Sequence, residues 1–100
     1  MTDTSSFAAI VTEEIVEPVK ELCEYFVAEN SQDEFAFFAN VLFMLKDPGS
    51  EVAVLEAVLE LSKCAFVGLN FSPIAQVQID SILERAITLS HTMSAPGTSN

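Results

Sequence analysis

The least polar stretch of this chain is residues 35–45, where Asn40 is the one polar side chain among eleven residues. A helix that meets water on one side needs a polar face, and this segment offers almost none. As a helix it would span roughly 16 Å at about 1.5 Å per residue, too short for the roughly 30 Å hydrocarbon core of a bilayer. We therefore expect protein to cover this segment on nearly all sides.

Four segments of the chain carry apolar residues at helical spacing between turn or capping residues. They cover residues 6–29, 32–46, 50–67 and 73–90. Pro18 lies inside the first segment. Because proline has no amide donor, it predicts a kink or a break near residues 16–17.

Capping and turn chemistry separates these segments. Ser31 and Glu34 fit a capping box for the second helix, and Ser72 before Pro73 is a typical start for the fourth. No segment alternates apolar and polar residues with a period of two, as a half-buried strand would. Short links favour antiparallel neighbours. The sequence therefore predicts an all-α fold, a four-helix up-down bundle whose first helix is kinked at Pro18.

The length of 100 residues indicates one domain. We expect it to cover residues 1–91. Residues 92–100 are small and polar and include Pro96 and Gly97, so they predict a disordered C-terminal tail.

The apolar stripes of the last two helices predict which side of each faces the core. For the third helix the predicted inward positions are Val52, Leu55, Val58, Leu59, Ser62, Ala65 and Phe66, with Val54 and Leu61 widening the stripe. For the fourth they are Ala75, Ile79, Ile82, Ala86 and Leu89, flanked by Val77, Leu83 and Ile87. Both stripes are wider than the share of a helix that a bundle core covers, about three residues in seven.

This apolar excess favours a homodimer over a monomer. If it were exposed to water, the apolar patch would exceed the few hundred Å² that is usual for monomers. The candidate dimer interface is Phe35, Phe37, Phe38, Val41 and Phe43. Asn40 is the candidate buried polar residue that sets helix register across it. The alternative is a compact monomer in which the second helix is the central element.

The net charge is −11, from fifteen acidic and four basic residues. The basic residues are scattered and form no patch, which excludes nucleic acids and anionic membrane surfaces as expected partners. Nine acidic residues and one basic residue fall in residues 1–34, a net charge of −8. The N-terminal third is thus the predicted electrostatic face of the molecule.

Within that third, Glu13, Glu17, Glu21 and Glu24 are spaced by four, four and three residues and share one predicted helix face. This face is the candidate docking surface for a basic protein partner. The alternatives are an ordinary solvated face, or a weak divalent-cation site, which would need oxygens converging from several elements.

The residues that carry chemistry are few. His91 is the one histidine and Thr88 stands three residues before it, so the Glu-x-x-His pairs of a dinuclear carboxylate site are missing. Cys23 and Cys64 lie 41 residues apart without local ligands and are expected to pack as small apolar groups. Lys20, three residues before Cys23, and Lys63, next to Cys64, leave a redox role open. We predict no metal, no cofactor and no enzymatic activity.

The first six residues are polar and acidic rather than signal-like, so we expect a cytoplasmic protein with reduced thiols. The sequence favours a non-catalytic, acidic helical interaction or regulatory protein that acts as a homodimer. The alternative is a small apolar ligand bound between helices or at the dimer interface. Its predicted wall is Phe37, Phe38, Phe43, Met44 and Phe66.

Overall fold

The structure is a computed structural model that describes residues 2–64, 69 and 71–98, with side chains described for 7–64, 69 and 71–91. The described residues form helices and contain no strand, which confirms the all-α fold class for this part of the chain. The elements are α1 (Thr2–Val11), η1 (Thr12–Val16), α2 (Glu17–Ala28), α3 (Gln32–Met44), α4 (Glu51–Ser62) and α5 (Pro73–Thr98). Four helical rods result, because α1, η1 and α2 follow one another without a gap and form the first helix.

The first helix accommodates Pro18 with a π-helical turn instead of a break. Pro18 has no amide to donate to the carbonyl of Glu14, four residues earlier. In η1, just before the proline, the Glu17 amide donates to the carbonyl of Thr12, five residues earlier. A bond of this kind admits one extra residue into the turn. The disturbance predicted near residues 16–17 therefore lies in the preceding turn, and residues 2–28 stay helical.

The starts of α3 and α4 differ in how they are capped. Ser50 accepts a hydrogen bond from the Ala53 amide at 3.2 Å through its hydroxyl, as an N-cap residue does. Ser31 occupies the N-cap position of α3, but its side chain makes no capping hydrogen bond. The bond predicted from the Ser31 hydroxyl in the capping box is therefore wrong. The Asp47 carboxylate accepts from the Gly49 amide at 3.3 Å in the intervening turn.

The ends of the last helices differ from the sequence prediction. α4 ends at Ser62, before the predicted end at residue 67, and the predicted cap Gly68 lies outside the described residues. Ser72 caps α5 as predicted, because its hydroxyl accepts from the Ala75 amide at 3.2 Å. α5 continues to Thr98, past the predicted end at residue 90. The disorder predicted for residues 92–100 is not tested by this and stays a prediction.

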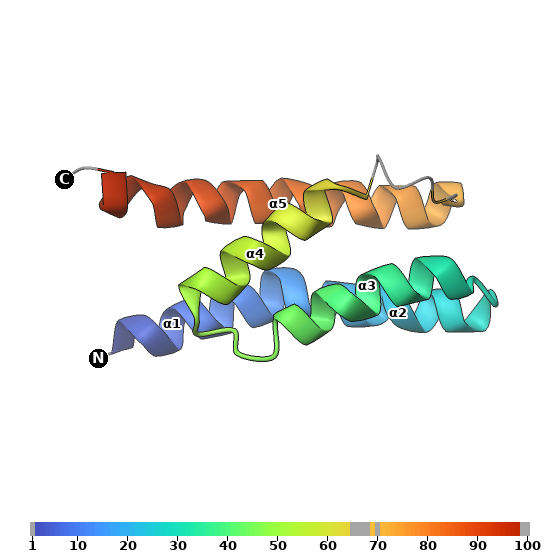
Figure 1. Cartoon of the computed structure of the whole chain (residues 1–100), viewed down its shortest axis with the longest axis horizontal. Helices are drawn as coiled ribbons and strands as arrows, with labels where there is room; N and C mark the ends of the chain where they lie inside the picture. Colours follow the sequence, from blue (N-terminus) through green and yellow to red (C-terminus); the bar gives the residue numbers. More distant parts are fainter. Residues whose placement is uncertain (1, 65–68, 70, 99–100) are drawn as a thin grey trace.

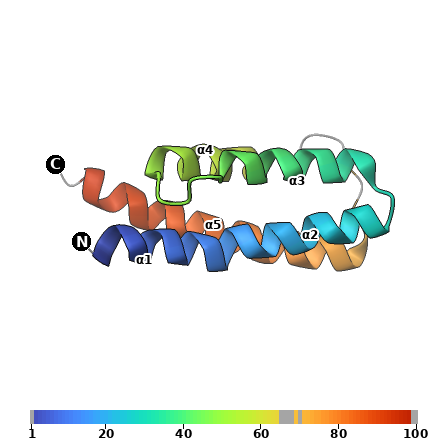
Figure 2. The ribbon, with the colours of Figure 1, turned by 90° about the horizontal axis from the view of Figure 1, so that it is seen from below.

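The helices lie in two layers (Figures 1 and 2). The first helix and α5 form one layer, and α3 and α4 form the other. α3 runs back along α2, and α4 crosses obliquely between α3 and α5 (Figure 1). α5 packs against η1 and α2, which closes the core. The oblique α4 departs from a regular bundle, and the up-down bundle stays a prediction.

The core between the layers is wholly apolar among the residues whose burial is described. Its largest members are aromatic and aliphatic side chains from all four helices. Phe26 of α2 and Phe38 of α3 stack at 5.7 Å between ring centroids, and Phe71 lies 6.1 Å from each of them. This aromatic cluster ties the segment before α5 to the first pair of helices.

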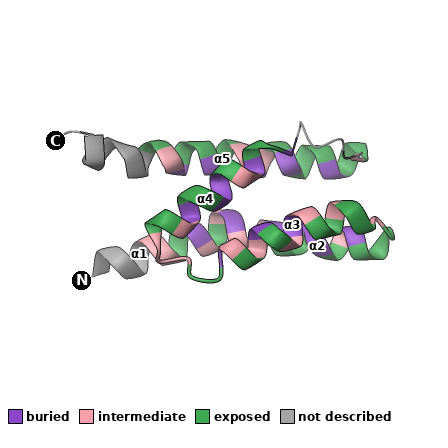
Figure 3. Cartoon of the chain, in the orientation of Figure 1, coloured by how far each residue is buried: buried purple, intermediate pink, exposed green. Residues whose placement is uncertain are grey.

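The sequence predicted the buried face of α5 and only part of that of α4 (Figure 3). The five predicted core residues of α5 are all buried. In α4 the buried residues are Val54, Ala57, Val58 and Leu61. The predicted inward residues Val52, Leu55 and Leu59 are exposed instead. Val54, Val58 and Leu61 of the predicted stripe are buried, which confirms that side of it. Ser62 is exposed, and Ala65 and Phe66 lie outside the described residues.

Candidate functional site

The four glutamates of the predicted docking surface all lie exposed on the first helix. Each follows a buried residue by two positions: Val11, Ile15, Val19 and Leu22 precede Glu13, Glu17, Glu21 and Glu24. Two residues along a helix correspond to a turn of about 200°. The glutamates therefore share the face opposite the core, called here the acidic face, and the π turn within it does not interrupt the pattern.

Few cations neutralise the acidic face. Lys20 lies 3.9 Å from Glu17, and both side chains are half exposed, so this pair has little effect. Arg85 of α5 approaches Glu14 at 3.6 Å, beside the face and not on it. Within the described residues no ion pair involves Glu13, Glu21 or Glu24.

The structure divides the five residues of the candidate dimer interface. Phe38 and Val41 are fully buried in the core of a single chain, where a second copy cannot reach them in this conformation. Phe37 is partly buried and stacks edge-on against Phe38 at 4.9 Å. Phe35 and Phe43 are exposed, by 38% and 65%. Of the predicted interface, these two alone are fully open to a partner.

Asn40 is exposed in the single chain and is no core residue. Its amide makes one long contact, from Nδ2 to Sδ of Met44 at 3.9 Å. The burial predicted for Asn40 is therefore absent within one chain. A register role across an interface stays a prediction.

A second surface emerges that the sequence interpretation missed. On α4, the exposed residues Val52, Leu55 and Leu59 each precede a buried residue by two positions. On α3, the exposed residues Ala36, Asn40 and Phe43 lie opposite the buried Phe38 and Val41 in the same way. These six residues are called here the outer face of α3 and α4. The signal in the sequence is that α4 carries aliphatic residues on two opposite sides.

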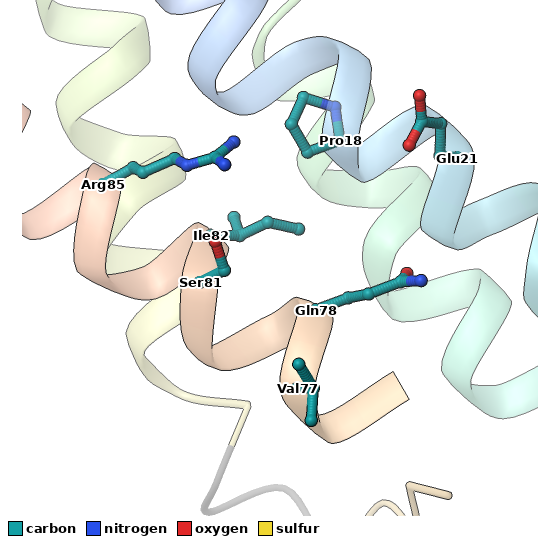
Figure 4. Close-up of a pocket in the computed structure, with 7 residues that line it drawn as sticks. All are labelled: Pro18, Glu21, Val77, Gln78, Ser81, Ile82 and Arg85. Atoms are coloured by element: carbon teal, nitrogen blue, oxygen red, sulfur yellow. The ribbon is translucent and has the colours of Figure 1, made fainter. Parts of the chain in front are cut away.

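An open groove of about 320 Å³ runs between the first helix and α5 (Figure 4). Arg85 and Gln78 extend from α5 towards Pro18 and Glu21 of α2. Ser81 also lines the groove, and the described residues give it no hydrogen bond to a base. An activated serine nucleophile has a base within hydrogen-bond distance, and none is described for Ser81.

Both cysteines are buried thiols, as predicted. Burial raises the pKa of Cys23 to about 11, and the adjacent Glu24 carboxylate adds to the shift. Burial also raises the pKa of Cys64, with a smaller contribution from Asp80. Because the thiolate is the reactive form, neither side chain has the character of a redox or nucleophilic cysteine.

The predicted apolar ligand wall does not form one surface. Phe38 is in the core and Phe43 points to solvent, while Phe66 lies outside the described residues. His91 is exposed on α5. In the described part of the chain, no group of three histidine, cysteine or acidic residues could hold a metal ion.

Among the described residues, no helix combines the length and the apolar character needed to cross a bilayer. The features available for function are therefore the acidic face, the outer face of α3 and α4, and the groove beside Arg85. No family model, curated protein or solved structure matches this chain.

Proposed function

We propose that this chain is a non-catalytic helical interaction or regulatory protein that acts as a homodimer and docks a basic protein partner through the acidic face. The observation that carries the proposal is the opposition of that face to the core. Four carboxylates project to solvent from one side of a helix whose other side is fully buried.

The charge distribution supports a basic partner. The acidic face belongs to a chain of net charge −11, and its carboxylates are largely without nearby cations. Such a potential accelerates encounter with positively charged surfaces and disfavours acidic ones. The first helix is held by the core along its length, so the face presents its charges in a fixed row.

The side chains support binding in preference to catalysis. The buried thiols are held protonated, and the groove offers a serine without a base. General acid–base chemistry needs a titratable group placed against a reacting atom. We propose the cytoplasm as the compartment, which agrees with two free thiols.

Affinity capture from the native host tests the docking proposal. The bait is the wild-type chain, compared with a variant in which Glu13, Glu17, Glu21 and Glu24 are all changed to Gln. The matched control changes four other exposed carboxylates, Glu29→Gln, Asp33→Asn, Asp80→Asn and Glu84→Gln, and removes the same charge.

The proposal expects a basic protein that binds the wild type and the control but is lost with the acidic-face variant. Recovery that is equal for all three baits would refute the docking surface. Equal loss from both variants would show that net charge alone attracts the partner, and would refute it as well.

A further inference from the structure

We propose that the outer face of α3 and α4 is the surface through which two copies of this chain associate, across a two-fold axis that pairs the two α4 helices antiparallel. This inference rests on the homodimer of the proposed function and names its interface.

α4 exposes a stripe of aliphatic side chains that one copy of the chain leaves uncovered. Val52, Leu55 and Leu59 are 71%, 41% and 59% exposed, on the side opposite its core residues. A helix that is apolar on both sides is typical of one buried on both sides. Within a single chain, α3 and α5 cover one of the two sides.

α3 extends this surface without adding charge. No charged residue occurs between Glu34 and Lys46, and Phe43 is the most exposed aromatic ring of the helix. Asn40 lies beside it with its amide committed to a single long contact at 3.9 Å to Met44. Its remaining donor and its carbonyl oxygen are available to a second copy, where an asparagine can fix the register.

The charge pattern fits a second copy of this chain. Two molecules of charge −11 repel each other, so they must meet where carboxylates are sparse. The acidic face belongs to the first helix, which lies in the other layer (Figure 2), and its glutamates are exposed on the side opposite the core. On α4, Glu56 and Lys63 follow Val52 and Leu59 by four residues each and therefore lie on the same flank of the exposed stripe.

A two-fold axis makes that flank self-complementary. In an antiparallel symmetric pair, a given flank of one helix faces the same flank of its copy. Lys63 of each molecule then faces Glu56 of the other, twice across the axis. Lys63 already lies 3.2 Å from Glu60 of its own chain, and its side chain is 62% exposed, so it is accessible to a second carboxylate.

The size of the surface sets the expected strength of the dimer. α3 and α4 contain 13 and 12 residues. At about 1.5 Å per residue and about 10 Å across, they offer a footprint of roughly 400 Å² per copy. Stable interfaces bury about 800 Å² per partner, so we expect a reversible dimer in the micromolar range.

Sedimentation velocity from about 1 to about 300 µM tests the interface. Leu59→Glu and Leu59→Lys change the net charge in opposite directions at a residue next to the proposed two-fold axis. Val77→Glu is the matched control, an exposed aliphatic residue of α5 at 69% exposure. We expect both Leu59 variants to weaken dimerisation at least about tenfold, and Val77→Glu to leave it unchanged.

The outcomes distinguish failure of the proposed interface from failure of the homodimer itself. If the wild type dimerises and either Leu59 variant dimerises equally well, the interface is overturned but the homodimer is kept. The same holds if Val77→Glu weakens dimerisation as much as the Leu59 variants do. A wild type that is monomeric at every concentration overturns both.

If circular dichroism shows that the Leu59 variants are unfolded, cross-linking decides. Leu59→Cys, close to the two-fold axis, is oxidised with oxidised glutathione and compared with Val77→Cys. A disulfide-linked dimer that forms at least about tenfold faster for Leu59→Cys supports the interface, and equal rates overturn it.

Discussion

Phe38 and Phe43 stand five residues apart in the least polar stretch of the sequence, and the structure gives them opposite environments. Phe38 is fully buried, with its ring 4.9 Å from Phe37 and 5.7 Å from Phe26. Truncation of a buried phenylalanine to alanine costs about 3–5 kcal/mol. Because three aromatic rings would lose their contact with Phe38, we expect Phe38→Ala to fall in the upper half of that range.

Phe43→Ala is the matched control. The Phe43 ring is 65% exposed, and Nζ of Lys46 lies 4.6 Å from its centroid. An exposed cation–π contact contributes about 0.5–1 kcal/mol. The expected loss in the free energy of unfolding is therefore about 1 kcal/mol or less.

Urea unfolding followed by far-UV circular dichroism measures both costs, at two protein concentrations at least about tenfold apart. The cost of Phe38→Ala should be the same at both concentrations, because Phe38 packs within one chain. Equal costs for the two variants, or a cost for Phe38→Ala that vanishes on dilution, would refute the core assignment. If Phe38→Ala is unfolded in water, Phe38→Leu gives the same comparison with a loss of about 1–2 kcal/mol.

Four further predictions concern the buried thiols and the serine hydroxyls that cap helices. Both buried thiols should react with iodoacetamide at pH 8 far more slowly in the folded chain than in urea, which mass spectrometry measures; a rate equal to that of the unfolded chain would contradict their burial. Because the folded chain holds the thiol proton more tightly, stability should fall as the pH rises from the ordinary thiol pKa of 9.0 towards about 11 for Cys23. Ser72→Ala removes both a helix cap and a 2.6 Å hydrogen bond to Tyr25 and should cost about 1–2 kcal/mol by urea unfolding, more than Tyr25→Phe, which removes the second contact alone. Ser50→Ala should lower the free energy of unfolding by about 1 kcal/mol and Ser31→Ala by only a few tenths, because of these two serines only Ser50 caps its helix with its hydroxyl. Equal losses would contradict the capping geometry.

The sequence predicted those helices best whose two sides differ most in polarity. On α5, Asp80 and Glu84 separate the outer side from the buried stripe, and the prediction of that stripe is confirmed. The first helix shows the same contrast between its core residues and the acidic face. Two apolar residues of that helix, Ile10 and Val27, are nevertheless exposed.

The failures occur where polarity gives no contrast. In residues 35–45 nearly every position is apolar, so periodicity could not separate the buried Phe38 from the exposed Phe43. Asn40 is exposed in the single chain, so its predicted burial across a dimer interface is not tested here and stays a prediction. The π turn depends on which backbone bond compensates for Pro18, and side-chain pattern alone does not encode that choice.

α4 shows that volume, as well as polarity, can set the rotation of a helix about its own axis. A half turn of α4 would bring Leu55 and Leu59 inward in place of Ala57 and Leu61, and it would turn the Glu56 carboxylate inward as well. The side that faces inward contains Ala57, and α5 contributes Ala75 and Ala86 to the same core. Small side chains let helix axes approach closely, and two leucines there would hold them apart. Two features therefore favour the rotational setting of α4: the Glu56 carboxylate stays outside and the small Ala57 side chain lies inside. A larger residue in place of Ala57 would remove the second preference and leave the first.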